Sequence, residues 1–269
     1  MQQIAAEKVR EALLAVEGTV IEDLRIPLPG DLRDISKAAA MVSGVVEDRI
    51  PEMLNRVRNE TWDEEGQLHA YEFRRMTIGF PDIQLVERAN PDNFIFELEA
   101  KSWYILATDP LTARYETSGD MVRQGTLITI VAWMLDSIVS GSPKLLRLYV
   151  DDAKRLAKVR DQAWEAIPPA GSHRVTQPDN PEGTPRSLLK TQAVPEMLNA
   201  QGQWRPESEN FGKLERLYDD QIRAFKDGVF SLVVAGKRLG EWRAFVSSAS
   251  HAQATRRLRR TSIGRPEPL

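Results

Sequence analysis

The stretch FELEAKSWYIL, residues 96–106, has the composition of a β-strand, because aromatic and aliphatic residues recur along it. Side chains of a strand alternate between its two faces. One face would pack into a core and carry Phe96, Leu98, Ala100, Ser102 and Tyr104. The other would carry two carboxylates, an ammonium and a large ring, from Glu97, Glu99, Lys101 and Trp103. Charged side chains in a row beside a ring predict the wall of a cleft.

A strand hairpin is expected around this stretch. The residues before it contain strand-like pieces at 71–78 and 80–86. Residues 88–93 (RANPDN) then have a composition typical of a turn, and 94–106 form the next strand of an antiparallel pair. Because positions 82 and 99 are equally distant from the middle of that turn, the hairpin would bring Asp82 close to Glu99 and Lys101.

Two carboxylates and a lysine at a sheet edge suit metal-dependent hydrolysis of phosphodiester bonds. Mg²⁺ prefers oxygen ligands and keeps several waters, so Asp82, Glu99 and the backbone carbonyl of Ala100 could supply the protein ligands. The metal would polarise the phosphate and lower the pKa of a bound water. Lys101 could orient that water, help deprotonate it or stabilise charge in the transition state. The alternative is a solvated strand face with a Glu–Lys cross-strand pair.

Pro81-Asp82 followed by Glu99-Ala100-Lys101 resembles the motif of the PD-(D/E)XK nuclease superfamily, which includes most type II restriction endonucleases. The resemblance covers roughly residues 35–150. It implies a restriction endonuclease-like core and an enzyme that cuts double-stranded DNA, leaving a 5′-phosphate and a 3′-hydroxyl. The cofactor it implies is Mg²⁺, with Mn²⁺ able to substitute. A type II restriction endonuclease acting as a homodimer is the leading role.

The same resemblance implies roles for individual residues. Asp82, Glu99 and Lys101 would be the catalytic and metal-binding residues. Members of the superfamily often add an acidic residue from the helix before the hairpin, for which Glu47 is the candidate, with Glu52 and Asp48 as substitutes. The alternatives left open are a repair or recombination nuclease of the same superfamily and a non-catalytic DNA-binding protein that retains the fold.

Several further side chains are candidates for contacts with DNA. Hydroxyls and arginines in the loop after the catalytic strand could fix the register on phosphates. Two polar residues are expected at the start of the next helix, and the arginine-rich C-terminal tail favours phosphate contacts. Each could also be ordinary packing or a solvated surface. The predicted DNA-contacting residues are Trp103, Arg114, Thr117, Ser118, Arg123, Gln124, Arg256, Arg257, Arg259 and Arg260.

Composition limits the chemistry that the chain can perform. A formal net charge of −3 over 269 residues gives no global basic field, so DNA binding would need local patches. The absence of cysteine excludes disulfides, thiolate zinc sites and a cysteine nucleophile. It also fits a reducing cytoplasm, where we expect the protein to act. No membrane association is expected, because the apolar run 125–139 is too short to span a bilayer and contains Asp136.

The order of expected elements predicts an α/β fold with a mixed central sheet flanked by helices. Helices are expected at 4–17, 35–58 (with Pro51 as a kink or break), 119–140 and 153–167, and a further strand at 145–150. We expect an N-terminal helical segment over 1–34, a nuclease core over 35–167, a flexible loop or insertion over 168–210, and a mainly helical C-terminal extension with a basic tail over 211–269.

Overall fold

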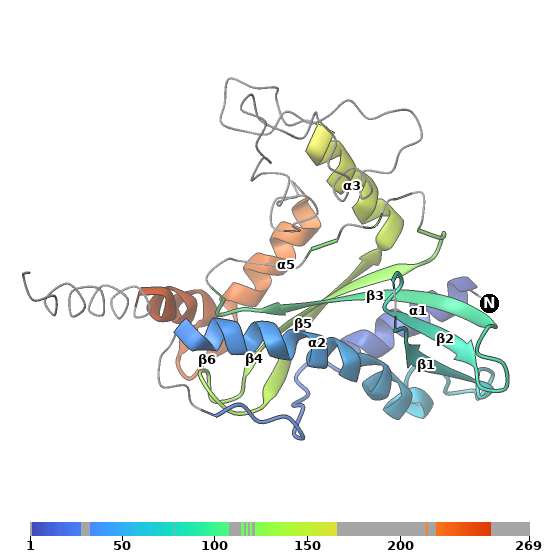
Figure 1. The fold of residues 1–269 in the computed structure, drawn as a ribbon, viewed down its shortest axis with the longest axis horizontal. Helices are drawn as coiled ribbons and strands as arrows, with labels where there is room; N and C mark the ends of the chain where they lie inside the picture. Colours follow the sequence, from blue (N-terminus) through green and yellow to red (C-terminus); the bar gives the residue numbers. More distant parts are fainter. Residues whose placement is uncertain are drawn as a thin grey trace, which may run out of the picture.

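The computed structural model of the chain describes residues 2–27, 33–77, 79–107, 114–115, 117, 119, 122–165, 214 and 219–248. One five-stranded sheet, in the order β1-β2-β3-β4-β5, organises the fold (Figure 1). Its strands are β1 (Tyr71–Arg75), β2 (Ile83–Glu87), β3 (Phe94–Tyr104), β4 (Leu127–Leu135) and β5 (Pro143–Asp152). All neighbours are antiparallel except β3 and β4, which are parallel. The predicted α/β class with a mixed sheet is confirmed.

The hairpin of β2 and β3 is confirmed together with its register. Ile83 lies opposite Leu98, which places the preceding residue, Asp82, beside Glu99. The turn covers 88–93 as predicted, and the N–H of Glu87 donates to the carbonyl of Asn93 at 2.8 Å to close it. A register shift follows Leu85, on the side of the hairpin away from Asp82.

The predicted helix over residues 119–140 is wrong, because the chain forms β4 there. All nine residues of β4 are buried, so its sequence LITIVAWML shows no alternation of polar and apolar side chains. Periodicity alone cannot distinguish such a run from a buried helix. The distinguishing signal was its β-branched run, Ile128 to Val131. Gly125, with φ at +85°, lies in the turn that enters the strand.

Helices pack on the sheet and share its core. α1 (Gln2–Ala15) is followed by Gly18 at φ +83°, as expected of a helix stop. α2 (Arg33–Arg56) continues through Pro51 without a break and packs along β3 and β1. The short helix η1 (Arg58–Glu60) follows it. α3 (Ala153–Glu165) comes directly after β5, and in Figure 1 it lies with α5 on the side of the sheet away from α2.

The described part of the C-terminal region is built into the same core. α5 (Asp220–Ser231) is followed by the small hairpin of β6 (Val233–Val234) and β7 (Lys237–Arg238), and by a helix over 239–248. Phe225 and Phe230 of α5 pack edge-on against Trp103 of β3, with ring centroids 6.0 and 5.5 Å apart. The C-terminal extension therefore completes one face of the sheet.

An ion-pair network fixes the start of α5. Asp219 caps the helix by accepting from the N–H of Ile222 at 2.9 Å, and it also accepts from Arg155 Nη1 at 2.8 Å. Arg155 also pairs with Asp151, whose Oδ2 accepts from the hydroxyl of Tyr149 at 2.6 Å. Because each of these charged groups has a partner, we assign the network to docking α5 on β5.

Two of the predicted segments lie outside the residues that the structure describes. The loop or insertion at 168–210 and the basic tail at 256–260 lie outside the described residues. Among the helices of the described ranges, none has the length and apolar character needed to cross a bilayer.

Candidate active site

Asp82 lies at the point where the chain enters β2, and both of its carboxylate oxygens have partners. Oδ2 accepts from the N–H of Ala100 at 3.0 Å and lies 3.1 Å from the ammonium of Lys101. Oδ1 lies 3.0 Å from Arg75 Nη1. The N–H of Asp82 donates to Glu99 Oε2 at 3.2 Å. The backbone and the side chain of Asp82 thus tie the start of β2 to the middle of β3.

Glu99 and Lys101 lie beside Asp82 on one face of β3, as the alternation of side chains predicts. The Lys101 ammonium is 2.5 Å from Glu99 Oε1 and 3.1 Å from Asp82 Oδ2. One ammonium therefore joins the two carboxylates expected to bind a metal. The side chains are only 7%, 14% and 20% exposed for Glu99, Asp82 and Lys101, so solvent screens this charge cluster weakly.

Burial and neighbouring charges shift the pKa values in this cluster. Burial raises the pKa of Glu99 to about 7, with Lys101 opposing the rise and Asp82 adding to it. Burial works to lower the pKa of Lys101, but the charges of Glu99 and Asp82 outweigh it, so that pKa is raised. Near neutral pH, Lys101 is therefore protonated, whereas Glu99 exchanges readily between its acid and its carboxylate.

Glu47 of α2 reaches the same cluster from a separate element. Its Oε1 accepts from the N–H of Ser102 at 2.8 Å, and burial raises its pKa. The charge of Lys101 opposes this rise in pKa and that of Asp82 adds to it, so the Glu47 carboxyl lies within electrostatic range of the hairpin. The substitutes considered for Glu47 lie elsewhere: Glu52 pairs with Arg49, and Asp48 pairs with Arg75 at 2.9 Å.

The backbone carbonyl of Ala100 is directed toward Asp82. In an extended strand, the N–H and C=O of one residue point to the same side, and the N–H of Ala100 donates to Asp82 Oδ2. Its carbonyl oxygen is therefore on the β2 side of β3 rather than on the β4 side. This places a third oxygen, besides the carboxylates of Asp82 and Glu99, where the chain enters β2 beside the central strand β3.

These oxygens fit a hard divalent cation that keeps several waters. Among the described residues, no group of three or more histidine or carboxylate side chains is placed to hold a metal ion. Two carboxylates and one carbonyl correspond instead to the partial set of protein ligands that Mg²⁺ takes when it keeps several of its waters. The absence of imidazole and thiolate groups from the cluster makes it a poor site for softer metals.

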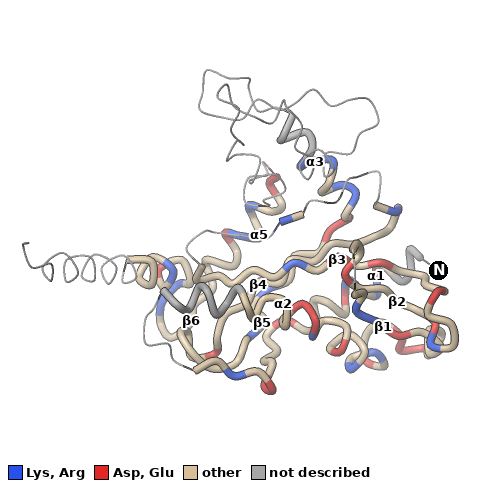
Figure 2. The backbone as a smooth tube through the Cα atoms, in the orientation of Figure 1, with Lys and Arg blue, Asp and Glu red and all other residues tan. Residues whose placement is uncertain are grey.

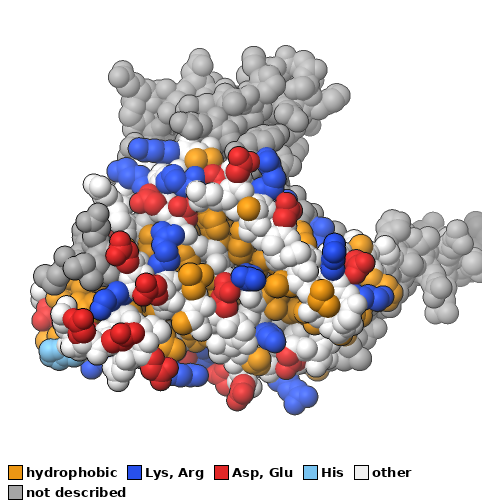
Figure 3. All heavy atoms as spheres, turned by 180° about the vertical axis from the view of Figure 1, so that it is seen from behind, with side chains coloured by type: hydrophobic (Ala, Val, Ile, Leu, Met, Phe, Trp, Pro, Cys, Tyr) orange, Lys and Arg blue, Asp and Glu red, His pale blue; other side chains and the backbone are white. Residues whose placement is uncertain are grey.

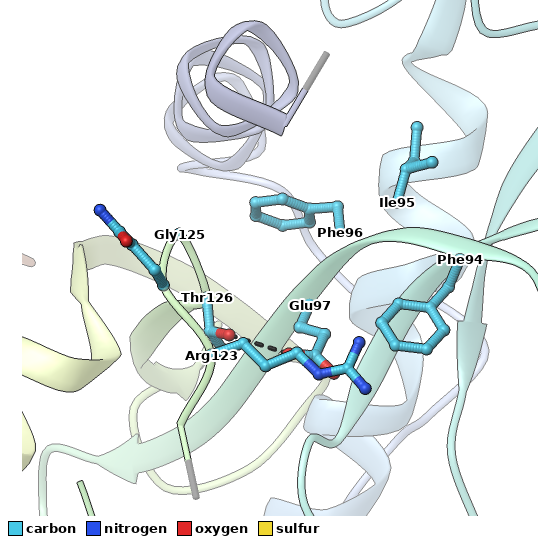
Figure 4. A pocket seen from close by; sticks show the side chains of 8 residues that line it. Phe94, Ile95, Phe96, Glu97, Arg123, Gly125 and Thr126 are labelled. Atoms are coloured by element: carbon cyan, nitrogen blue, oxygen red, sulfur yellow. Dashed lines mark hydrogen bonds and ion pairs between the residues drawn. The ribbon is translucent and has the colours of Figure 1, made fainter. Parts of the chain in front are cut away.

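Glu97 lies on the same face of β3, two residues before Glu99, where it borders a small pocket (Figure 4). Its carboxylate accepts from Thr126 Oγ1 at 2.9 Å, and Arg123 Nε is 3.8 Å away. The Arg123 guanidinium lies over the ring of Phe94, 4.6 Å from its centroid, while 63% of the side chain remains exposed. Arg123 therefore offers a positive charge next to the acidic face of β3.

The predicted DNA-contacting residues have different outcomes. Trp103 is fully buried, so the expectation that it contacts DNA is wrong: α5 covers that end of the charged face. Arg123 and Gln124 are exposed, but they lie in the turn before β4 rather than at a helix start. Arg114 is exposed, and the carbonyl of Thr117 accepts from Arg160 at 2.7 Å. The remaining predicted contacts lie outside the described residues, and they are Ser118, Arg256, Arg257, Arg259 and Arg260.

Two arginines that shape the site, Arg160 and Arg75, were not predicted from the sequence. Arg160 of α3 is buried and donates to the carbonyls of Tyr115 and Thr117, which anchors this part of the β3–β4 connection. The ring of Tyr115 lies 6.4 Å from that of Phe80, next to Pro81 and Asp82. Arg75 pairs directly with Asp82. Neither arginine belongs to a local motif, so only the packing of distant elements reveals it.

No family model, curated protein or solved structure matches this chain. The chemistry of the site therefore rests on its own geometry.

Proposed function

We propose that this protein is a Mg²⁺-dependent endonuclease that hydrolyses phosphodiester bonds of double-stranded DNA, with a site of the PD-(D/E)XK type. The observation that carries the proposal is the single ammonium of Lys101 bound between Asp82 and Glu99, at 3.1 and 2.5 Å. Asp82 lies directly before β2, whereas Glu99 and Lys101 lie on β3, up to 19 positions later in the chain. Their order along the chain corresponds to the PD-(D/E)XK motif, and so does the contact of Lys101 with both carboxylates.

The sheet around the site is compatible with the core of that superfamily. A long helix, α2, precedes three antiparallel strands, and the third of these pairs in parallel with β4. A parallel pair requires the chain to cross from one end of the sheet to the other, which residues 105–126 accomplish. Glu47 then brings the helix to the end of the hairpin that carries the motif.

Each residue of the cluster has a role in the proposed reaction. Asp82, Glu99 and the Ala100 carbonyl would hold Mg²⁺, with Glu47 reaching it through water. The bound cation supplies Lewis acidity and a water of lowered pKa. Lys101 has a raised pKa, so it would act as a charged donor that orients the attacking water and stabilises negative charge on the phosphate. A base that removes a proton would need the opposite shift, so we favour the stabilising role.

DNA would have to approach through local positive charge. Acidic and basic side chains are interspersed over the face seen in Figure 3, and the formal net charge of the chain is −3. The exposed Arg123 lies in the turn before β4, and its neighbour Glu97 is roughly 7 Å from Glu99 along β3. A phosphate contact there would position the backbone along the face that carries Glu99 and Lys101.

The test of the proposal is cleavage of a panel of plasmid and phage DNAs, methylated and unmethylated, with Mg²⁺, Mn²⁺ or EDTA. We expect covalently closed circles to be linearised with either metal and left intact in EDTA. Discrete fragments with 5′-phosphates would support a type II restriction endonuclease, and cutting at branched or damaged substrates would support a repair or recombination role. Retarded but uncut DNA on every substrate would overturn the proposed activity and leave a DNA-binding protein.

Arg123→Ala is expected to weaken DNA binding without sequence preference, by roughly threefold to tenfold, and to reduce the slope of log K against log salt by about 1. The reason is that an exposed arginine contacting a phosphate releases counterions but reads no base. Fluorescence anisotropy in Ca²⁺, at several salt concentrations, measures both quantities. Arg238→Ala, which removes an exposed arginine on β7, is the matched control and should leave the slope unchanged.

A further inference from the structure

Arg75, the last residue of β1, lies among three carboxylates. Its Nη1 is 3.0 Å from Asp82 Oδ1, its Nε is 2.9 Å from Asp48 Oδ1, and its Nη2 is 4.0 Å from Glu47 Oε2. Nη1 also donates to the backbone carbonyl of Asp82 at 3.3 Å. Figure 2 shows basic and acidic positions close together around β1. The guanidinium thus joins α2 to the start of β2.

The contacts of Asp82 leave no carboxylate oxygen without a positive or donor partner. Lys101 and the Ala100 N–H occupy Oδ2, and Arg75 occupies Oδ1. A divalent cation that binds Asp82 would therefore compete with these positive partners for the charge of the carboxylate. Arginine and metal ion compete for the same negative charge, so removal of the arginine leaves a stronger attraction for the metal.

Arg75 is the partner better placed to leave. Its side chain is 32% exposed, whereas that of Lys101 is 20% exposed. Arg75 also contacts a second carboxylate, that of Asp48, whose side chain is 58% exposed. If Arg75 swung away from Asp82, it would keep an ion pair with Asp48. Both described ion-pair partners of Lys101, Asp82 and Glu99, lie inside the proposed metal site.

We propose that Arg75 is a resident counter-ion that holds Asp82 before the metal binds, and that it releases Asp82 and keeps only its ion pair with Asp48 when a divalent cation takes its place. This inference rests on the proposed metal site and adds a positioning residue to it. Arg75 would thereby set the cation concentration at which the site fills, and would keep the carboxylates oriented below that concentration.

The experiment is calorimetric titration of the DNA-free protein with Mn²⁺, which does not depend on activity. Arg75→Gln should tighten Mn²⁺ binding by about fivefold to tenfold, a range typical of coupling between neighbouring charges. Arg74→Gln is the matched control, because Arg74 is the adjacent residue and pairs with Glu72 at 2.6 Å. Arg74→Gln removes the same charge from the same strand and should change the affinity much less.

A second variant tests the direction of the movement. Asp48→Asn removes the alternative partner, so Arg75 should stay on Asp82 and Mn²⁺ should bind more weakly. Glu52→Gln, which removes the same charge from the same helix, is the control for general electrostatics. In the Arg75→Gln background the effect of Asp48→Asn should shrink to that of Glu52→Gln, because no arginine remains to be redirected.

The outcomes separate this inference from the proposed function. Wild-type binding that is lost in Asp82→Asn, with Arg75→Gln equal to or weaker than wild type, overturns the role of Arg75 and leaves the metal site standing. Absence of Mn²⁺ binding to the wild type overturns both. If Arg75→Gln does not fold, Arg75→Lys provides the same test, since a lysine keeps the charge but loses the fork. It should tighten binding by a smaller factor, and unchanged binding would refute the inference.

Discussion

Asp82→Asn is expected to abolish Mg²⁺-dependent cleavage, with a loss on the order of a thousandfold or more in the single-turnover rate. Asparagine keeps the shape of the side chain and one acceptor oxygen, so the hairpin should still form. It removes the negative charge that pairs with Lys101 and that would hold the cation. Lys101→Met is expected to have a comparable effect, because it keeps an apolar stem in the strand and removes the ammonium.

Linearisation of supercoiled plasmid under enzyme excess measures this loss. Asp92→Asn, in the exposed turn of the same hairpin, and Lys144→Met, on β5, make the same chemical changes away from the cluster. Both controls should cut at wild-type rates, and circular dichroism should show all four variants folded. Cleavage by Asp82→Asn at the control rate would place the active site elsewhere in the chain.

In the absence of metal, the protein should lose stability as the pH rises from about 4.5 to about 7, and Glu99 is the cause. Burial raises the folded pKa of Glu99 to about 7 from its ordinary value of 4.5. Across this window the folded state keeps a proton that the unfolded state releases, so the free energy of unfolding falls with rising pH. The difference in pKa corresponds to a loss on the order of 3 kcal/mol, complete above about pH 7.

Urea unfolding in EDTA at intervals between pH 4.5 and 8 measures this loss. The glutamine of Glu99→Gln cannot ionise. The free energy of unfolding of this variant should therefore vary less with pH than that of the wild type, and the difference between the two curves is the contribution of Glu99. Glu64→Gln, at an exposed position, should follow the wild-type curve. Mg²⁺ should restore stability mainly above pH 7, where Glu99 is charged. Parallel curves for wild type and Glu99→Gln would show that Glu99 titrates normally in the folded protein.

Local patterns were sufficient to predict the hairpin of β2 and β3 that carries the candidate site. Alternation along 96–104 placed Glu99 and Lys101 on one face, and the turn composition of 88–93 set the pairing that brings Asp82 to them. These features depend on a few neighbouring residues and on the fixed period of a strand. The proposed cation and the proposed DNA target have no comparable local signal in the sequence.

Other parts of the fold depend on contacts between distant elements, which one sequence does not encode locally. β4 lacks alternation because it is buried on both faces, so its pattern resembled a buried helix. Trp103 alternates onto the charged face, yet α5, more than a hundred residues later, covers it. Arg75 reaches Asp82 only because α2, β1 and the start of β2 converge. Each discrepancy therefore arises from tertiary packing.

The contact of α5 with Trp103 restricts how this protein can diversify. Trp103 is two residues from Lys101 on the same face of the same strand, and Phe225 and Phe230 fill the space against it. A C-terminal region that supplies interior side chains at this position cannot be exchanged between proteins as an independent module. Changes in α5 that alter the volume of either phenylalanine would shift the strand that carries Lys101. Sequence changes in α5 are therefore constrained by the geometry of β3.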